Sequence, residues 1–218
     1  VYGLNTGVSK TKTYVDLGLF YNIAWTEKLG VEDPAQMYLD GKWNYSEFKN
    51  WCLTVQSLLN SENGEYAIGG HSYYYWSGMT NTTGVKVYDR ESVSIEIDSD
   101  RSQNAASFIN ELVNENVFDV NESWAEKDGG FIEGKTVMTT GKLWFINNKS
   151  RWANNMFGDD TRIGYVPFPY PDDMNREEAK MGCTDLTVYM YGSGRSNYYP
   201  EGVTIKEIYR AVNAMCIG

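Results

Sequence analysis

The segment from Asn44 to Leu59 constrains the fold most, because its apolar residues recur at the spacing of one helix face. After Phe48, apolar residues follow three, four, seven, ten and eleven positions later (Trp51, Cys52, Val55, Leu58 and Leu59). Asn44 precedes Glu47 by three positions, the pattern of a capping box with Asn as the N-cap. The pattern predicts an amphipathic helix with one face on a core.

Helical and β-prone segments alternate along the rest of the chain. A short helix is expected over 24–30, closed by Gly30, because glycine tolerates the left-handed conformation at a helix end. A longer helix is expected to begin at Ser99 or Asp100, and another to span 201–216. Extended segments are expected within 13–23, 63–70, 93–97, 136–140, 162–171 and 186–192. This alternation predicts an α/β layered fold.

Composition narrows the classes of partner. The 218 residues carry a net charge of −10, and no cluster of Lys and Arg is longer than two neighbours, which argues against a nucleic-acid partner. The three cysteines are far apart and fit no zinc or redox motif. No phosphate loop or dinucleotide fingerprint is present, so neither a cofactor nor a metal is expected.

The case for catalysis is weak. His71 is the single histidine, so a Ser–His–Asp triad or a multi-histidine metal site would need it. Paired carboxylates could serve a glycosidase, but helix capping and solvation also explain them. The three pairs are Asp98 with Asp100, Asp159 with Asp160, and Asp172 with Asp173. No catalytic residue is assigned.

Aromatic clusters give a stronger indication. Residues 73–76 read Tyr-Tyr-Tyr-Trp, and neither a strand nor a helix can bury all four rings easily. Trp144 follows a Gly–Lys turn. Flat rings beside polar groups suit a sugar, because rings pack on C–H faces while polar groups take the hydroxyls. Plain core packing is the alternative interpretation.

Five segments, in order, resemble the extracellular solute-binding proteins of ABC importers, in their carbohydrate-binding group. The resemblance covers most of the chain. The segments read LFYNIAWTEKLGVEDP, DGKWNYSEFKNW, IEIDSDRSQNAASFINELVNE, FIEGKTVMTTGKLW and IGYVPFPYP. None is decisive alone, but their shared order is fairly specific.

The resemblance implies a periplasmic-binding-protein-like lobe, a three-layer helix/sheet/helix unit that forms half of a two-lobed clamshell. Residues 1–218 are expected to form the second lobe only, with hinge strands near 1–20 and 182–192. The family's preceding lobe is expected to be absent from these residues.

The resemblance further implies a non-enzymatic, extracellular or periplasmic protein, tethered as a lipoprotein in its full-length form. Its partners would be a carbohydrate or similar small polar solute, bound in an interlobe cleft, and the membrane permease subunits. The residues carried over as solute-binding are Tyr75, Trp76, Trp144, Thr184 and Asp185. The alternatives are an extracellular glycoside-active enzyme and a carbohydrate-binding or sensor domain.

Overall fold

The computed structural model describes two units of the chain. One comprises residues 1–14 and 184–218, and the other residues 15–183. Within them, the described residues are 3–5, 17–85, 88–89, 92–119, 129–146, 152, 162–180, 188–190, 207 and 210. The predicted helix over 201–216 lies outside these residues, apart from Glu207 and Arg210.

The first unit contains a two-stranded antiparallel ladder. Strand β1 (Gly3–Asn5) pairs with β8 (Val188–Met190), with Leu4 opposite Tyr189. The strand expected within 186–192 is therefore confirmed as β8. The ladder joins the two segments that the sequence assigns to a hinge, and that role stays a prediction.

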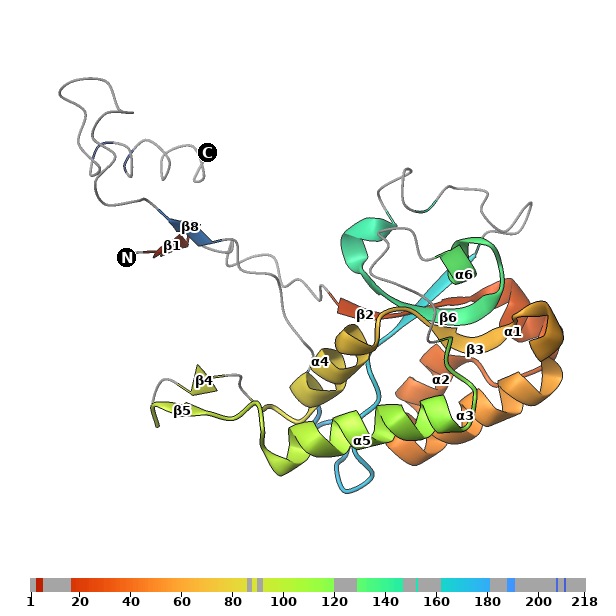
Figure 1. The fold of residues 1–218 in the computed structure, drawn as a ribbon, viewed down its shortest axis with the longest axis horizontal. Helices are drawn as coiled ribbons and strands as arrows, with labels where there is room; N and C mark the ends of the chain where they lie inside the picture. The colour runs from red at the N-terminus through yellow and green to blue at the C-terminus, as the bar shows by residue number, and fades with distance from the viewer. Residues whose placement is uncertain are drawn as a thin grey trace. The chain divides into compact units, whose positions relative to one another are not determined.

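The second unit is built on a four-stranded mixed sheet with the strand order β3-β6-β2-β7 (Figure 1). Strand β3 (Tyr66–Gly69) runs parallel to β6 (Thr136–Lys142). Strand β2 (Leu17–Asn22) is antiparallel to both β6 and β7 (Ile163–Val166). All four strands were expected from the sequence, and the strand that comes first in the chain lies inside the sheet.

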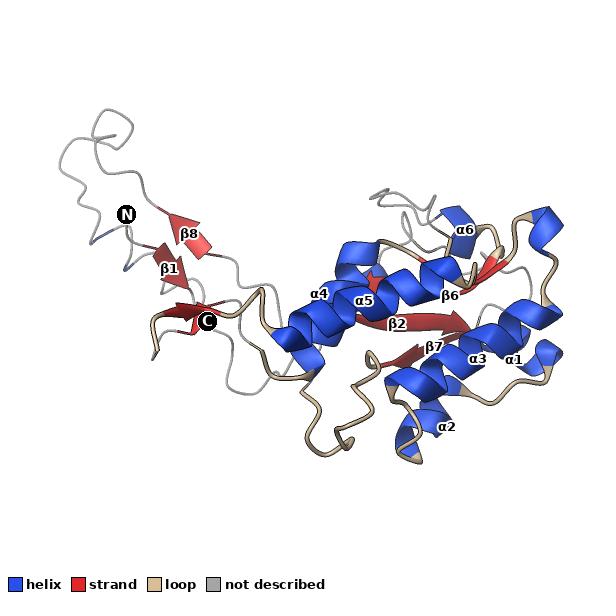
Figure 2. Cartoon of the chain, turned by 60° about the horizontal axis from the view of Figure 1, so that its bottom comes forward, coloured by secondary structure: helices blue, strands red, loops and turns tan. Residues whose placement is uncertain are grey.

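One face of this sheet is covered by helices (Figure 2). Their apolar sides meet the sheet in the main core, where Trp43, Phe48, Ile68 and Met138 have no exposed surface. The helices are α1 (Ile23–Leu29), α2 (Pro34–Leu39), α3 (Tyr45–Leu58), α4 (Ser72–Thr82) and α5 (Asp100–Asn114).

The opposite face carries a smaller aromatic cluster made by Phe20, Phe131, Phe145 and Trp152. In the described part of the chain, the short helices on this side are α6 (Gly129–Ile132) and η2 (Leu143–Phe145) (Figure 1). The α/β class is thus confirmed, with a thicker helical layer on one face of the sheet than on the other.

Local sequence explains the helix boundaries. The Asn44 carboxamide accepts the Glu47 N–H at 2.9 Å, so α3 begins as its cap pattern predicts. Gly30 ends α1 at a φ of 68°, also as predicted. Helix α2 was not expected from the sequence; Pro34 occupies its first turn, and Asp33 caps it.

The described part of the second unit also contains three shorter elements. A 3-10 turn, η1 (Ser61–Asn63), connects α3 to β3. Strand β4 (Tyr88–Asp89) pairs antiparallel with β5 (Ser94–Ile95), which is shorter than the strand expected over 93–97.

Candidate functional site

The candidate site lies at one edge of the sheet. Strands β3 and β6 are parallel, so their carboxyl ends share this edge, and Gly69 lies opposite Thr139. Strand β3 continues there into α4, and β6 continues into η2. In open α/β sheets, ligands bind outside the carboxyl ends of the strands, because the loops there are free to vary. The side chains of α4 and η2 are therefore the first candidates.

Gly70 makes the turn from β3 into α4 possible. Its φ is 96°, and a Cβ at this position would lie 2.6 Å from the Thr140 hydroxyl and 2.9 Å from the Thr140 backbone nitrogen. Any side chain would clash with β6, so the tight turn requires glycine. The turn delivers His71 to the start of α4.

An aromatic cluster forms at the start of α4. His71 caps the helix, and its Nδ1 accepts the Tyr73 N–H at 3.1 Å. Ring centroids of neighbours in the cluster are 5.7 to 6.4 Å apart. We call His71, Tyr73, Tyr74 and Trp76 the α4 ring cluster. Tyr73 is 48% exposed, and it is the only aromatic side chain among the exposed large hydrophobic residues of the described ranges.

The two residues predicted on this helix occupy different environments. Trp76 is half-buried, its indole N–H donates to the Ser102 hydroxyl at 3.1 Å, and its ring tilts against Tyr73. Tyr75 has no exposed surface, and its hydroxyl donates to the Gly69 carbonyl at 2.9 Å. The Tyr75 ring packs edge-on against Phe118, so in this structure it supports α4 from within the core.

The other predicted site residues are located only in part. Trp144 belongs to η2, directly after β6, so its backbone lies at the same sheet edge as α4. Its side chain lies outside the described part of the structure, as do Thr184 and Asp185 altogether. Their contact with a solute stays a prediction.

Tyr73 and His71 were not selected from the sequence, although a usable signal was present. Once α4 begins at Ser72, helical spacing places Tyr73 and Trp76 on one face, three positions apart. Tyr75 then falls on a different face. The Gly69–Gly70 pair before His71 marked the turn from which this register could have been counted.

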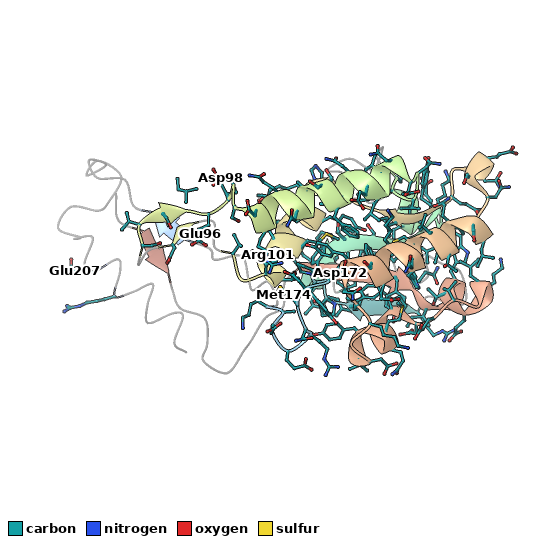
Figure 3. All side chains as sticks on the ribbon, turned by 90° about the horizontal axis from the view of Figure 1, so that it is seen from below. Glu96, Asp98, Arg101, Asp172, Met174 and Glu207 are labelled. Carbon is teal, nitrogen blue, oxygen red and sulfur yellow. The ribbon has the colours of Figure 1, made fainter. Side chains whose placement is uncertain are left out.

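Three members of the carboxylate pairs, Asp100, Asp172 and Asp173, have structural roles in the described structure. Asp172 accepts the Ser46 N–H at 2.9 Å and the Ser46 hydroxyl at 2.6 Å. Asp173 pairs with Arg101, whose guanidinium lowers the pKa of that carboxyl. Figure 3 labels Arg101, in the first turn of α5, and Asp172, in the segment that follows β7. Asp100 lies in the first turn of α5, where a negative charge interacts favourably with the helix dipole.

The remaining pair, Asp159 and Asp160, lies outside the described ranges. Among the residues that are described, no three His, Cys, Asp or Glu side chains are grouped so that they could hold a metal ion. None of the helices in those ranges is both long enough and apolar enough to cross a bilayer.

A pocket of about 540 Å³ lies away from the α4 ring cluster, between α3, α5 and the segment after β7. Tyr45 and Phe108 stack at its base, with ring centroids 4.4 Å apart. The Tyr45 hydroxyl is buried without a hydrogen-bond partner in the described structure, and burial raises the pKa of Tyr45. Among the charged groups that line it, Arg101 pairs with Asp173, and Lys49 pairs with Glu111.

Solved structures with the same fold belong to longer proteins, which this chain matches only in part. The GacH receptor of Streptomyces glaucescens, solved with acarbose, is 20% identical with a TM-score of 0.55, over 80% of this chain and 41% of its own. Lmo0181 of Listeria monocytogenes, solved with cycloalternan, is 16% identical with a TM-score of 0.54, over 79% of this chain and 40% of its own. A solute-binding protein of Thermotoga lettingae, bound to α-D-tagatose, is 19% identical with a TM-score of 0.55, over 78% of this chain and 41% of its own.

These likenesses establish the fold, and the chain spans about two fifths of the length of the proteins it matches. A comparison with curated proteins finds no match. The model of the family described as bacterial extracellular solute-binding protein matches residues 4–203. The chain therefore belongs to the bacterial extracellular solute-binding protein family.

Proposed function

We propose that the intact protein captures a carbohydrate or similar small polar solute for an ABC importer, without chemically changing it. The observation that carries this proposal is the α4 ring cluster at the carboxyl ends of β3 and β6, with Tyr73 48% exposed. Family membership supports capture as the function, and three proteins of the same fold were solved with carbohydrates.

The ring cluster suits a sugar for a physical reason. Exposed aromatic rings pack on the C–H faces of a pyranose, while nearby polar groups bond its hydroxyls. Tyr73 and Trp76 offer such rings from one side of a helix whose position the core determines. Trp144 is proposed to add a second ring from η2 at the same sheet edge, and Thr184 and Asp185 to supply polar contacts.

Capture requires an opposing wall. A ligand held between two lobes that close on a hinge is desolvated from both sides, whereas one wall alone binds weakly. We propose that the surface of residues 15–183 forms one wall and that further sequence of the intact protein forms the other. The closed state would then be recognised by permease subunits outside the cytoplasmic membrane, where a lipid anchor would retain the protein.

The test uses the intact protein, including any sequence that its gene encodes beyond these residues. A panel of mono-, di- and oligosaccharides, polyols and short peptides is screened by thermal shift, and hits are measured by calorimetry. We expect a carbohydrate hit that is recovered unchanged by chromatography. Tyr73→Ala should weaken its binding about tenfold, the equivalent of roughly 1.4 kcal/mol.

Leu39→Ala is the matched control, because Leu39 is another exposed apolar residue, 62% accessible, on α2. It should leave the affinity unchanged. A hydrolysed or transferred sugar product would instead support the glycoside-active enzyme. If Tyr73→Ala and Leu39→Ala weakened binding equally, the α4 ring cluster would not belong to the binding site.

A further inference from the structure

A side-chain hydrogen bond joins helices α4 and α5 beside the ring cluster. The Trp76 indole N–H donates to the Ser102 hydroxyl at 3.1 Å. Ser102 lies in the first turn of α5 and is only 2% exposed, while Trp76 is half-buried. The bond therefore connects a ring at the surface to a hydroxyl in the interior.

The presence of serine at this buried position needs an explanation. A buried hydroxyl without a partner destabilises a protein, and alanine is the better helix former and is close to serine in size. The apolar neighbours of Ser102 on the same helix, such as Ala105, show that this face accepts a methyl group. The partner that accounts for the hydroxyl in the structure is the Trp76 indole.

The bond also determines how the indole is oriented. Tryptophan has one donor, at one edge of an asymmetric ring, so a partner for that donor selects one of the two flipped orientations about χ2. Tyr73 packs at 41° to Trp76, with ring centroids 5.7 Å apart, and so depends on the same orientation. Among the bonds described for Trp76, the one to Ser102 is the polar contact that sets the angle of the indole.

We propose that Ser102 is a positioning residue of the solute-binding surface: it holds the Trp76 indole in the orientation in which Trp76 and Tyr73 meet a sugar. The inference rests on the proposed function of the α4 ring cluster. Ser102 itself is too buried to touch the solute. It acts through Trp76, so removing its hydroxyl changes affinity only when the indole N–H is present.

Two measurements on the intact protein test this. The first records the indole N–H resonances of ¹⁵N-labelled protein, with the Trp76 signal identified by its loss in Trp76→Phe. Ser102→Ala should shift that signal and speed its exchange with solvent, because the proton loses its acceptor, and Ser102→Thr should restore both. The second measures affinity for the carbohydrate found in the panel. Ser102→Ala should weaken binding about fivefold, within the range of one lost hydrogen bond.

Controls separate positioning from general damage. Ser107→Ala removes an exposed hydroxyl from the same helix and should change neither readout. In the Trp76→Phe background, Ser102→Ala should cost no further affinity, since phenylalanine has no N–H to place. An equal loss in both backgrounds would overturn the inference, as would an unshifted indole signal or an unchanged affinity in Ser102→Ala. If the unsubstituted protein binds no member of the panel, the proposed function fails, and this inference fails with it.

Discussion

Tyr21 ties the central strand to the helix that follows α1. Its hydroxyl donates to the Asp33 carboxylate, with both oxygens 3.0 Å away, and Asp33 Oδ1 also accepts the Gln36 N–H that opens α2. Burial first, and then the Asp33 carboxylate, raise the pKa of Tyr21 from its ordinary value of 10.0. The phenol therefore stays protonated, as a donor, at neutral pH.

We expect Tyr21→Phe to lower the free energy of unfolding by about 1.5 kcal/mol at neutral pH, because a buried bond to a charged acceptor is lost. The raised pKa of Tyr21 adds a pH dependence. The contribution of the Tyr21 phenol to the free energy of unfolding is fully present below the ordinary tyrosine pKa, and it is lost as pH rises through the folded-state pKa of Tyr21. Urea unfolding followed from about pH 9 upward should thus show a shallower loss of stability in the variant.

Asp33→Asn is the companion variant, because it keeps an acceptor for the start of α2 but removes the negative charge beside the Tyr21 hydroxyl. The pKa of Tyr170 is also raised, first by burial, so Tyr21→Phe should retain some alkaline destabilisation. Identical alkaline slopes for the unsubstituted protein and Tyr21→Phe would contradict the assignment.

Helix α4 holds the ring cluster in place through close packing at Gly78. A Cβ at this position would lie 2.3 Å from two atoms of the Phe168 ring, and Phe168 is itself buried. Glycine disfavours a helix interior by about 1 kcal/mol relative to alanine. Here the close contact with Phe168 outweighs that preference.

Gly78→Ala should therefore destabilise the protein by about 1 to 2 kcal/mol, since overpacking typically costs about 1 to 3. It should also weaken carbohydrate binding, because the displaced helix carries Tyr73 and Trp76. Thermal unfolding and calorimetry measure the two effects. Ser77→Ala, one position earlier in the same helix, is the control, and a stabilising Gly78→Ala would show that Phe168 moves aside freely.

The helices differ in how well the sequence predicts them. Helices α3 and α5 are long enough for several turns of apolar periodicity, so both were found with their starts. The six residues of α2 contain too few turns for that signal. Residues 73–76 fitted a strand or a helix equally, and the tertiary packing on α4 determined the outcome.

The candidate site was predictable to a similar degree. An aromatic surface was expected from the tyrosine run, and Trp76 was assigned to it. Helical spacing separates Tyr75 from Tyr73 and Trp76. Which of the two faces is buried depends on Phe118 and Phe168, which lie far along the chain and pack against Tyr75. The resemblance of five ordered segments identified the family, which composition alone did not.

The molecule consists of two units, and its β1–β8 ladder belongs entirely to one of them. Leu4→Pro removes a backbone N–H from the middle of β1, where proline is disfavoured. Hydrogen exchange read by mass spectrometry should then show lost protection over Val188–Met190, while protection over Leu17–Asn22 is kept. Loss of protection in both segments would show that the units do not unfold separately.

The interior place of β2 has a consequence for how the chain is made. Synthesis delivers Leu17–Asn22 early, yet the neighbours of β2 in the sheet begin at Thr136 and Ile163. Pairing between such distant segments is slow, and strands without neighbours invite aggregation. Leu19, Phe20 and Tyr21, all buried in the finished sheet, thus emerge from the ribosome long before either neighbour, and β2 lacks both pairing partners until β7 has been translated.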